Sequence, residues 1–194
     1  MNMAHRRSNP VGAPAPTIGC AYLDVPAFAA RVWLAWSERG LQRLTWSAEG
    51  SGAQAVLGQT SADLRPLPAA YADVLRAYFA GEAVDPTVLA VDLYGTPFQT
   101  KVWHALRAIG RGQVQSYAAI AAAVGAPRAT RAVGGANGSN RVAIVVPCHR
   151  VVAAGHRLGG YTGGLRFKRL LLELEGARIV SDVVHPGQMQ LLPD

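Results

Sequence analysis

Residues 142–152 read Val-Ala-Ile-Val-Val-Pro-Cys-His-Arg-Val-Val. The apolar, β-branched start of this stretch, Val142 to Val146, predicts a buried strand, and Pro147 predicts the point where that strand ends. Cys148 would therefore follow directly after a strand end, at the kind of position from which side chains often serve a functional site. The stretch thus predicts both a piece of core and a reactive centre beside it.

Cys148 is either a small buried hydrophobic residue, as most lone cysteines are, or a nucleophile. A thiol reacts as the thiolate, so a neighbour has to lower its pKa of about 8.5 or accept its proton. Adjacent residues seldom point the same way, so we expect a water molecule between the thiol and His149, while Arg150 adds positive potential. Glu175 is either a solvated helix-end residue or the carboxylate that orients a histidine. Lys168, two turns earlier on the same face, is either solvated or a donor in the same pocket.

Charge is distributed unevenly along the 194 residues, half of which are apolar. Residues 18–91 carry five basic and seven acidic side chains, whereas residues 92–176 carry eleven basic and three acidic ones. The excess of positive charge in the second segment indicates a polyanionic partner such as DNA or RNA. A general preference for arginine in the proteome is the alternative.

The two cysteines lie far apart and form neither a disulfide framework nor a zinc-binding pattern. We therefore expect a reduced, cytoplasmic setting, a buried thiol at Cys20, and no metal or other cofactor. The sequence predicts no membrane association, because no apolar run reaches the length of a membrane span.

Composition and periodicity divide the chain into four expected segments: a disordered tail over 1–17, an N-terminal α+β domain over 18–90, a C-terminal domain over 92–176 and a looser tail over 177–194. In the N-terminal domain, Arg31 to Trp36 and Leu41 to Trp46 predict two strands of a hairpin, and Leu67 to Phe79 predicts a helix.

The C-terminal domain begins with capping signals. Thr96 predicts the N-cap of a helix over 97–109, and Ser116 predicts the N-cap of a second helix that runs to residue 124. A third helix is expected over 129–136 after a glycine turn, so the second and third helices predict a helix-turn-helix. The small residues of the third helix predict a close approach, either to a partner surface or to the rest of the domain.

A glycine-rich loop and a last helix complete this domain. The loop Gly159 to Gly164 does not match a phosphate-binding motif, and it predicts a turn that brings backbone close to a ligand. Leu165 to Glu175 predicts a helix that Gly176 closes.

Residues 144–152 resemble the active-site signature of the O6-alkylguanine-DNA alkyltransferases. The resemblance continues in the family's order and spacing through 97–99, Ser116 and Tyr117, 131–136, Asn140, the Tyr161 loop and 171–176. It implies an α+β fold with a small N-terminal α/β domain, RNase H-like in character, and a C-terminal helical domain that contains a helix-turn-helix and the active-site cysteine. The N-terminal 90 residues match the family only in size and expected character.

The resemblance also implies roles for individual residues. Cys148 would take the alkyl group from guanine O6, His149 would accept the thiol proton through a water molecule, and Glu175 would orient His149. Asn140 would brace the active-site turn, and Tyr117 would contact the guanine. The other implied substrate contacts are Val151, Tyr161, Thr162 and Lys168. Arg131 would enter the duplex in place of the flipped nucleotide, and the other implied DNA contacts are Thr130, Ala132, Gly134, Gly135 and Arg150.

The implied activity is irreversible and stoichiometric, because water does not hydrolyse a thioether to regenerate the cysteine. The implied partner is double-stranded DNA that contains O6-alkylguanine, and O4-alkylthymine is implied as a further substrate. The implied acting species is a monomer that is able to assemble cooperatively on DNA. Two positions depart from the family pattern: Arg141 stands where many members have proline, and Thr162 where many bacterial members have arginine. The alternatives are a lesion-binding protein without transfer, a helix-turn-helix regulator and a cysteine hydrolase.

Overall fold

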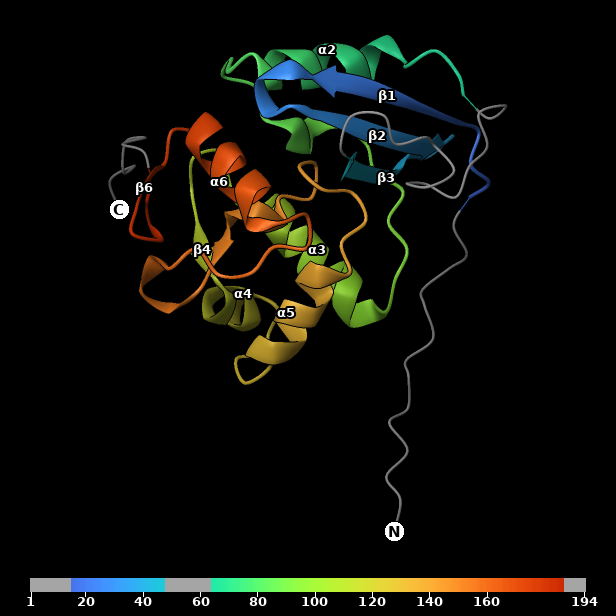
Figure 1. The fold of residues 1–194 in the computed structure, drawn as a ribbon. Coiled ribbons are helices and arrows are strands. Elements are labelled where there is room, and N and C mark those ends of the chain that lie inside the picture. Colours follow the sequence, from blue (N-terminus) through green and yellow to red (C-terminus); the bar gives the residue numbers. More distant parts are fainter. Residues whose placement is uncertain (1–14, 48–63, 187–194) are drawn as a thin grey trace.

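The computed structural model describes residues 15–47 and 64–186, which form an α+β arrangement (Figure 1). A three-stranded sheet and helix α2 lie at one end, and the helices of the second half lie at the other. The predicted disordered tail falls largely on residues 1–14, which lie outside the described residues. No helix within the described ranges is long and apolar enough to cross a membrane.

The sheet has the order β1-β2-β3 and is antiparallel throughout, with strands β1 (Gly19–Val25), β2 (Ala30–Ser37) and β3 (Gly40–Ser47). The hairpin predicted between β2 and β3 is confirmed. Its turn ends at Gly40, whose φ of +140° and close approach to the Ala90 backbone leave no room for a Cβ. Helix α2 (Ala69–Phe79) follows, as predicted, and buries Leu75 and Tyr78.

The second half begins with α3 (Pro97–Arg107), whose predicted N-cap Thr96 is confirmed and forms a capping box: the Thr96 hydroxyl accepts from Gln99 N, and Gln99 Oε1 accepts from Thr96 N. The helices α4 (Tyr117–Ala123) and α5 (Thr130–Gly138) pack together, and Ser116 caps the first of them as predicted. The last helix is α6 (Leu165–Leu174). Short elements complete the chain: η1 (Pro26–Phe28), η3 (Pro86–Val88), β4 (Gln115–Ser116), η4 (Cys148–Arg150), β5 (Val151–Val152) and η5 (Ala154–His156).

The strand predicted over Val142 to Val146 is wrong. This segment is a buried tight turn, in which Val145 N donates to Ala143 O at 2.8 Å, Val146 N donates to Val142 O at 2.9 Å, and Ile144 has a φ of 71°. The run is apolar because most of it lies in the core, and its pairing with β3 is limited to an isolated parallel bridge between Val142 and Leu44. Cys148 therefore begins a short 3-10 helix instead of following a strand end.

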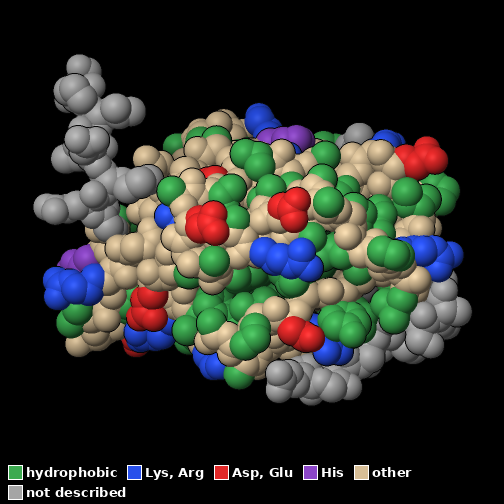
Figure 2. Space-filling model, turned by 90° about the horizontal axis from the view of Figure 1, so that it is seen from above, with side chains coloured by type: hydrophobic (Ala, Val, Ile, Leu, Met, Phe, Trp, Pro, Cys, Tyr) green, Lys and Arg blue, Asp and Glu red, His purple; other side chains and the backbone are tan. Residues whose placement is uncertain are grey.

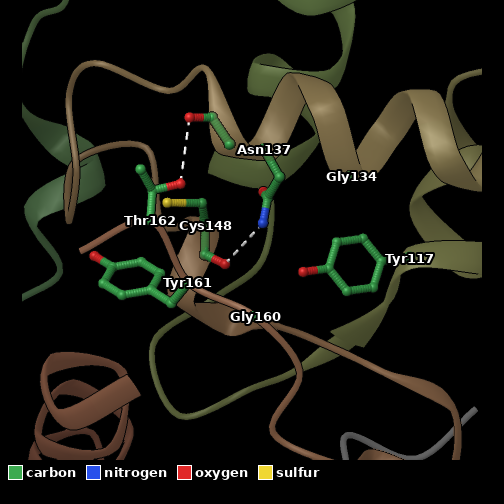
Figure 3. A pocket seen from close by; sticks show the side chains of 8 residues that line it. Tyr117, Gly134, Asn137, Cys148, Gly160, Tyr161 and Thr162 are labelled. Atoms are coloured by element: carbon green, nitrogen blue, oxygen red, sulfur yellow. Dashed lines mark hydrogen bonds between the residues drawn. The ribbon is translucent and has the colours of Figure 1, made fainter. Parts of the chain in front are cut away.

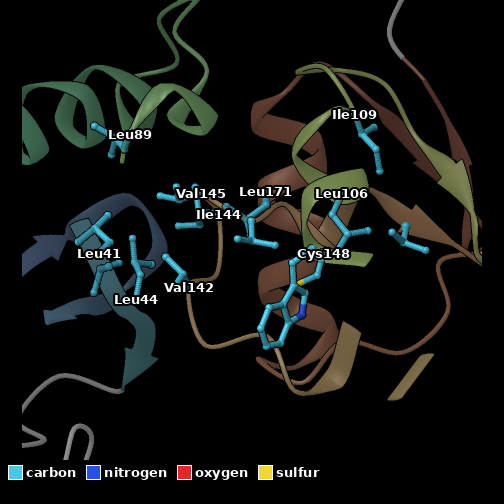
Figure 4. Close-up of a cluster of buried hydrophobic side chains, with 14 of the residues drawn as sticks. Leu41, Leu44, Leu89, Leu106, Ile109, Val142, Ile144, Val145, Cys148 and Leu171 are labelled. Atoms are coloured by element: carbon cyan, nitrogen blue, oxygen red, sulfur yellow. The ribbon is translucent and has the colours of Figure 1, made fainter. Parts of the chain in front are cut away.

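One hydrophobic cluster joins the two halves around this turn (Figure 4). Leu41 and Leu44 of the sheet reach it from one side, while Leu106 of α3 and Leu171 of α6 reach it from the other. The backbone also connects the halves, since Leu44 N donates to Arg141 O and Ala143 N donates to Leu44 O. The active-site turn is thus held by both halves of the chain.

The loose tail predicted after residue 176 is wrong for Arg178 to His185. Strands β6 (Arg178–Val180) and β7 (Val183–His185) form an antiparallel hairpin, and Val184 packs with Val152, Leu158 and Leu172 in a second apolar cluster. The sequence did not predict this packing, because the alternation of apolar and polar residues over 178–185 is too short to indicate strands. Residues 187–194 lie outside the described residues.

Candidate active site

A cavity of about 330 Å³ opens beside Cys148 (Figure 3). Tyr117, at the first turn of α4, and Tyr161, in the loop before α6, lie on either side of the cysteine in this view. The α5 helix supplies the third wall. The cavity is lined by Tyr117, Gly134, Asn137, Gly138, Cys148, Gly160, Tyr161 and Thr162.

The amide of Asn140 holds the thiol and the turn that carries it. Its Nδ2 lies 3.0 Å from Cys148 Sγ and 2.8 Å from Val146 O, and its Oδ1 accepts from Val142 N at 3.0 Å. Burial raises the pKa of the Cys148 thiol, while the Asn140 hydrogen bond and the charge of Lys168 act to lower it. The predicted bracing role of Asn140 thus has a geometric basis, with a direct contact to sulfur in addition.

The His149 imidazole is buried and contacts Glu175. His149 Nε2 lies 3.0 Å from Glu175 Oε1. A carboxylate only accepts, so Nε2 carries the hydrogen and Nδ1 keeps its lone pair. Burial lowers the pKa of His149, although Glu175 acts to raise it. The net lowering favours the neutral ring. Nδ1 is buried and has no hydrogen-bond partner among the described residues, so it is free to act as a base.

Glu175 and Lys168 are both buried, so the solvated alternatives for these two residues are wrong. Burial would raise the pKa of Glu175, but His149 and Arg150 together hold it far below its ordinary value. Lys168 Nζ donates to Val151 O at 2.7 Å and to Gly160 O at 3.2 Å, and burial lowers its pKa to about 8. Lys168 therefore joins the reactive segment to the cavity loop.

Comparison with known proteins finds close relatives of this chain. A family model described as 6-O-methylguanine DNA methyltransferase, DNA binding domain, matches residues 97–177. The methylated-DNA–protein-cysteine methyltransferase of Mycobacterium tuberculosis is 52% identical over 121 residues, which are 61% of this chain and 73% of the relative. The Shigella flexneri protein of the same name is 42% identical over 144 residues, 74% of this chain and 80% of the relative.

The chain belongs to the methylated-DNA–protein-cysteine methyltransferase family. It is an α+β DNA repair methyltransferase with a C-terminal DNA-binding domain. The crystal structure of the M. tuberculosis O6-methylguanine methyltransferase superposes with a TM-score of 0.67 at 42% identity, covering 81% of this chain and 92% of the other. A structure of the M. tuberculosis protein in complex with DNA superposes with a TM-score of 0.65 at 40% identity, with the same coverage.

The DNA contacts predicted on α5 are accessible in this methyltransferase. Thr130, Arg131, Ala132 and Gly135 are exposed, and Gly134 borders the cavity. A Cβ added at Gly134 or Gly135 would meet nothing within 4 Å, so these glycines are not required for packing inside the domain. Ala136, by contrast, is buried in the core, so packing inside the domain accounts for its small size.

The α4–α5 pair lies at the opposite end of the molecule from α2 (Figure 1). The face seen from above in Figure 2 carries acidic and basic side chains side by side. Such a mixed surface differs from the one-signed surface that a polyanion selects.

The prediction that Arg150 contacts DNA is wrong. Its side chain is fully buried and donates from Nε and Nη2 to Glu175, at 2.9 and 2.8 Å, and from Nη1 and Nη2 to Asp85, at 3.1 and 3.0 Å. Its Nη1 also donates to Ile109 O. A position next to the nucleophile in sequence does not determine where a side chain points. The Arg150 guanidinium points into the protein and binds Glu175.

Three polar side chains of the site were not predicted. Asn137 lines the cavity and its Nδ2 donates to Cys148 O at 3.3 Å; its place one turn before Asn140, in a helix of small residues, was the available signal. Tyr78 and Asp85 reach the site from the N-terminal part of the chain. No local signal marks them, because their partners lie more than 60 residues away.

Proposed function

We propose that Cys148 removes the alkyl group from O6 of guanine in double-stranded DNA, and from O4 of thymine, and keeps it. The observation that carries this proposal is the placement of a buried thiol, held by Asn140, at a cavity beside a neutral histidine whose base nitrogen has no partner among the described residues. A hydrolase would need a route to regenerate the cysteine. A thioether provides none, so each molecule reacts once.

The proposed step balances with the residues present. His149 Nδ1 takes the thiol proton through a water molecule, and the thiolate attacks the alkyl carbon. The S–C bond forms as the C–O6 bond breaks, and the electron pair moves into the guanine ring, which takes up a proton to leave as guanine. Glu175 stabilises the imidazolium that exists between these two proton transfers.

The cavity walls fit a flipped base. Tyr117 would contact the guanine ring, and Tyr161 and Thr162 would bound the side of O6 and its alkyl group. The carbonyl of Val151 accepts from Lys168 and that of Cys148 accepts from Asn137, yet each oxygen keeps a second lone pair for the exocyclic amine.

A second cavity of about 230 Å³ shares Cys148, Tyr161 and Thr162 and extends to Arg43 and Trp46 of β3. We propose that it receives alkyl groups larger than methyl. The space on this side of the thiol would set the range of lesions that the protein repairs.

We propose that Arg131 enters the duplex from α5 while the small face around Gly134 and Gly135 approaches the minor groove. A base inside the helix cannot reach a buried thiol, so the nucleotide has to be extruded. A monomer acting in the cytoplasm would suffice for this reaction, since the described residues of one chain supply every proposed contact.

Incubation with a duplex that contains one O6-methylguanine, followed by mass spectrometry, tests the proposal. The expected result is a single methyl mass gain on the peptide that contains Cys148. Cys148→Ser should show no gain, whereas Cys20→Ser, which removes the other thiol, should gain one methyl group. Absence of a gain in the unmodified chain would overturn the proposal, as would repeated turnover.

A further inference from the structure

Oε1 of Glu175 accepts three hydrogen bonds. Two come from the adjacent pair of residues in η4, from His149 Nε2 at 3.0 Å and from Arg150 Nη2 at 2.8 Å. The third comes from Tyr78 Oη at 2.8 Å. Tyr78 belongs to α2, 97 residues away in sequence and outside the segment that the family's DNA-binding model covers.

The Tyr78 hydroxyl is well suited to act as a permanent donor. Its side chain is fully buried, and a buried hydroxyl without a partner is costly, so the bond to Glu175 is needed to keep it there. Burial and the adjacent Glu175 charge raise the pKa of Tyr78 well above its ordinary value. Tyr78 thus stays protonated while the carboxylate stays ionised.

The same N-terminal part of the chain holds Glu175 by a second route. Asp85, just before η3, accepts from Nη1 and Nη2 of Arg150, and Arg150 in turn donates to both oxygens of Glu175. Gly112 N lies 3.4 Å from Glu175 Oε2. Every oxygen of this carboxylate is therefore oriented by groups from outside the helix that carries it.

From this geometry we propose that Tyr78 is a positioning residue for the transfer reaction: its hydroxyl orients Glu175 and shares the negative charge that Glu175 presents to His149. The N-terminal half then takes part in setting the basicity of the active-site histidine. This inference rests on the proposed role of His149 as the base.

Loss of the hydroxyl in Tyr78→Phe leaves Oε1 with two donors. Without the Tyr78 hydrogen bond, more of the negative charge of Glu175 acts on His149. This charge favours the imidazolium, so the pKa of His149 rises. The other charged and titratable groups around this pair stay in place: Arg150 in η4 and Lys168 in α6 act on His149, Tyr161 in the cavity loop lies near Glu175, and Asp85 before η3 pairs with Arg150. We expect the acidic limb of the rate–pH profile to move up by about half a pH unit, a roughly threefold change in the protonation ratio.

The experiment compares single-turnover methyl transfer from an O6-methylguanine duplex across about pH 5 to 9 for the unmodified chain, Tyr78→Phe and Tyr71→Phe. Tyr71→Phe is the matched control, because it removes the same hydroxyl from the same helix, and its ring contacts Trp36 rather than Glu175. Only Tyr78→Phe should shift the limb. A Tyr78→Phe profile that superposes on that of the unmodified chain would overturn the inference.

NMR titration of the His149 ring nitrogens provides a readout that does not need transfer. The His149 titration should move to higher pH in Tyr78→Phe, and this shift should vanish when Tyr78→Phe is made in a Glu175→Gln background. A shift of equal size in that background would show that Tyr78 does not act through Glu175. Failure of the proposed function is distinguishable, because the unmodified chain would then transfer no methyl group at any pH.

Discussion

Asn140 Nδ2 lies 3.0 Å from Cys148 Sγ, and the same nitrogen lies 2.8 Å from the carbonyl of Val146. One amide therefore contacts the nucleophile and also holds the turn from which it projects. This double role couples the reactivity of the thiol to the stability of the turn. Both effects can be measured in a substituted protein.

Asn140→Ala should raise the pKa of Cys148, because the hydrogen bond that lowers it is lost. The loss of three hydrogen bonds should also reduce the free energy of unfolding by about 1 to 3 kcal/mol. The pH dependence of iodoacetamide alkylation reports the thiol pKa, and urea unfolding reports the stability. Ser139→Ala, next in the chain but without a contact to sulfur, should leave the alkylation profile unchanged. An unaltered profile in Asn140→Ala would refute the coupling.

Arg150→Met should destabilise the protein by about 3 to 5 kcal/mol, because it leaves the buried Glu175 carboxylate without its main ion-pair partner. Urea unfolding measures the loss. If Arg150→Met were stable and bound DNA more weakly, Arg150 would contact DNA after all, and the buried role seen in the structure would be contradicted.

Arg131→Met should behave in the opposite way. Arg131 is exposed on α5, so its loss should leave the free energy of unfolding within about 0.5 kcal/mol of the original. Binding to duplex DNA should weaken, and methyl transfer from duplex should slow more than transfer from the free base. Parallel rates on the two substrates would argue against an Arg131 role in extruding the nucleotide.

Gly134→Ala should make the protein more stable and less active. A Cβ at this position meets nothing within 4 Å, and alanine in a helix interior is favoured over glycine by about 1 kcal/mol. The added methyl group would nonetheless stand at the edge of the cavity and on the face that we propose to approach DNA. Thermal unfolding should show the gain, and DNA titration the loss. Equal affinities for the two proteins would show that the small face is not a contact surface.

Stability should fall in two stages on acidification. The folded chain resists protonation of His149, because burial lowers its pKa from 6.5, so the unfolded chain binds the extra proton and stability drops as pH falls below about 6.5. The pKa of Glu175 lies far below 4.5, so a second loss begins near that pH. Urea midpoints against pH measure both stages. Glu175→Gln should flatten the second stage, and a steep fall in that variant would assign it elsewhere.

Thr162→Arg should slow the transfer of large alkyl groups more than that of methyl. Thr162 lines both cavities beside Cys148, and its hydroxyl donates to Gly138 O across the entrance. Single-turnover rates on O6-methylguanine and O6-benzylguanine measure the ratio. Thr162→Ser keeps the hydroxyl and should keep the ratio; an unchanged ratio in Thr162→Arg would place the size limit at another residue.

The elements that depend on neighbouring residues followed from the sequence alone. The capping box of α3 and the cap of α4 each join residues three positions apart, and the β2–β3 hairpin needs only a short turn at Gly40. Local chemistry is enough to specify such features. The signature around Cys148 likewise predicted the family and most of the site, because its residue types and spacing are specific.

Only the tertiary structure decided which way the side chains of that signature face. An apolar β-branched run is compatible with a strand or a buried turn. Packing between β3 on one side and α3 and α6 on the other selects the turn at Ile144. A positive charge is compatible with DNA or a buried ion pair, and Asp85 and Glu175 select the second for Arg150. These partners lie 65 and 25 residues from Arg150, so their contact arises only when the chain folds.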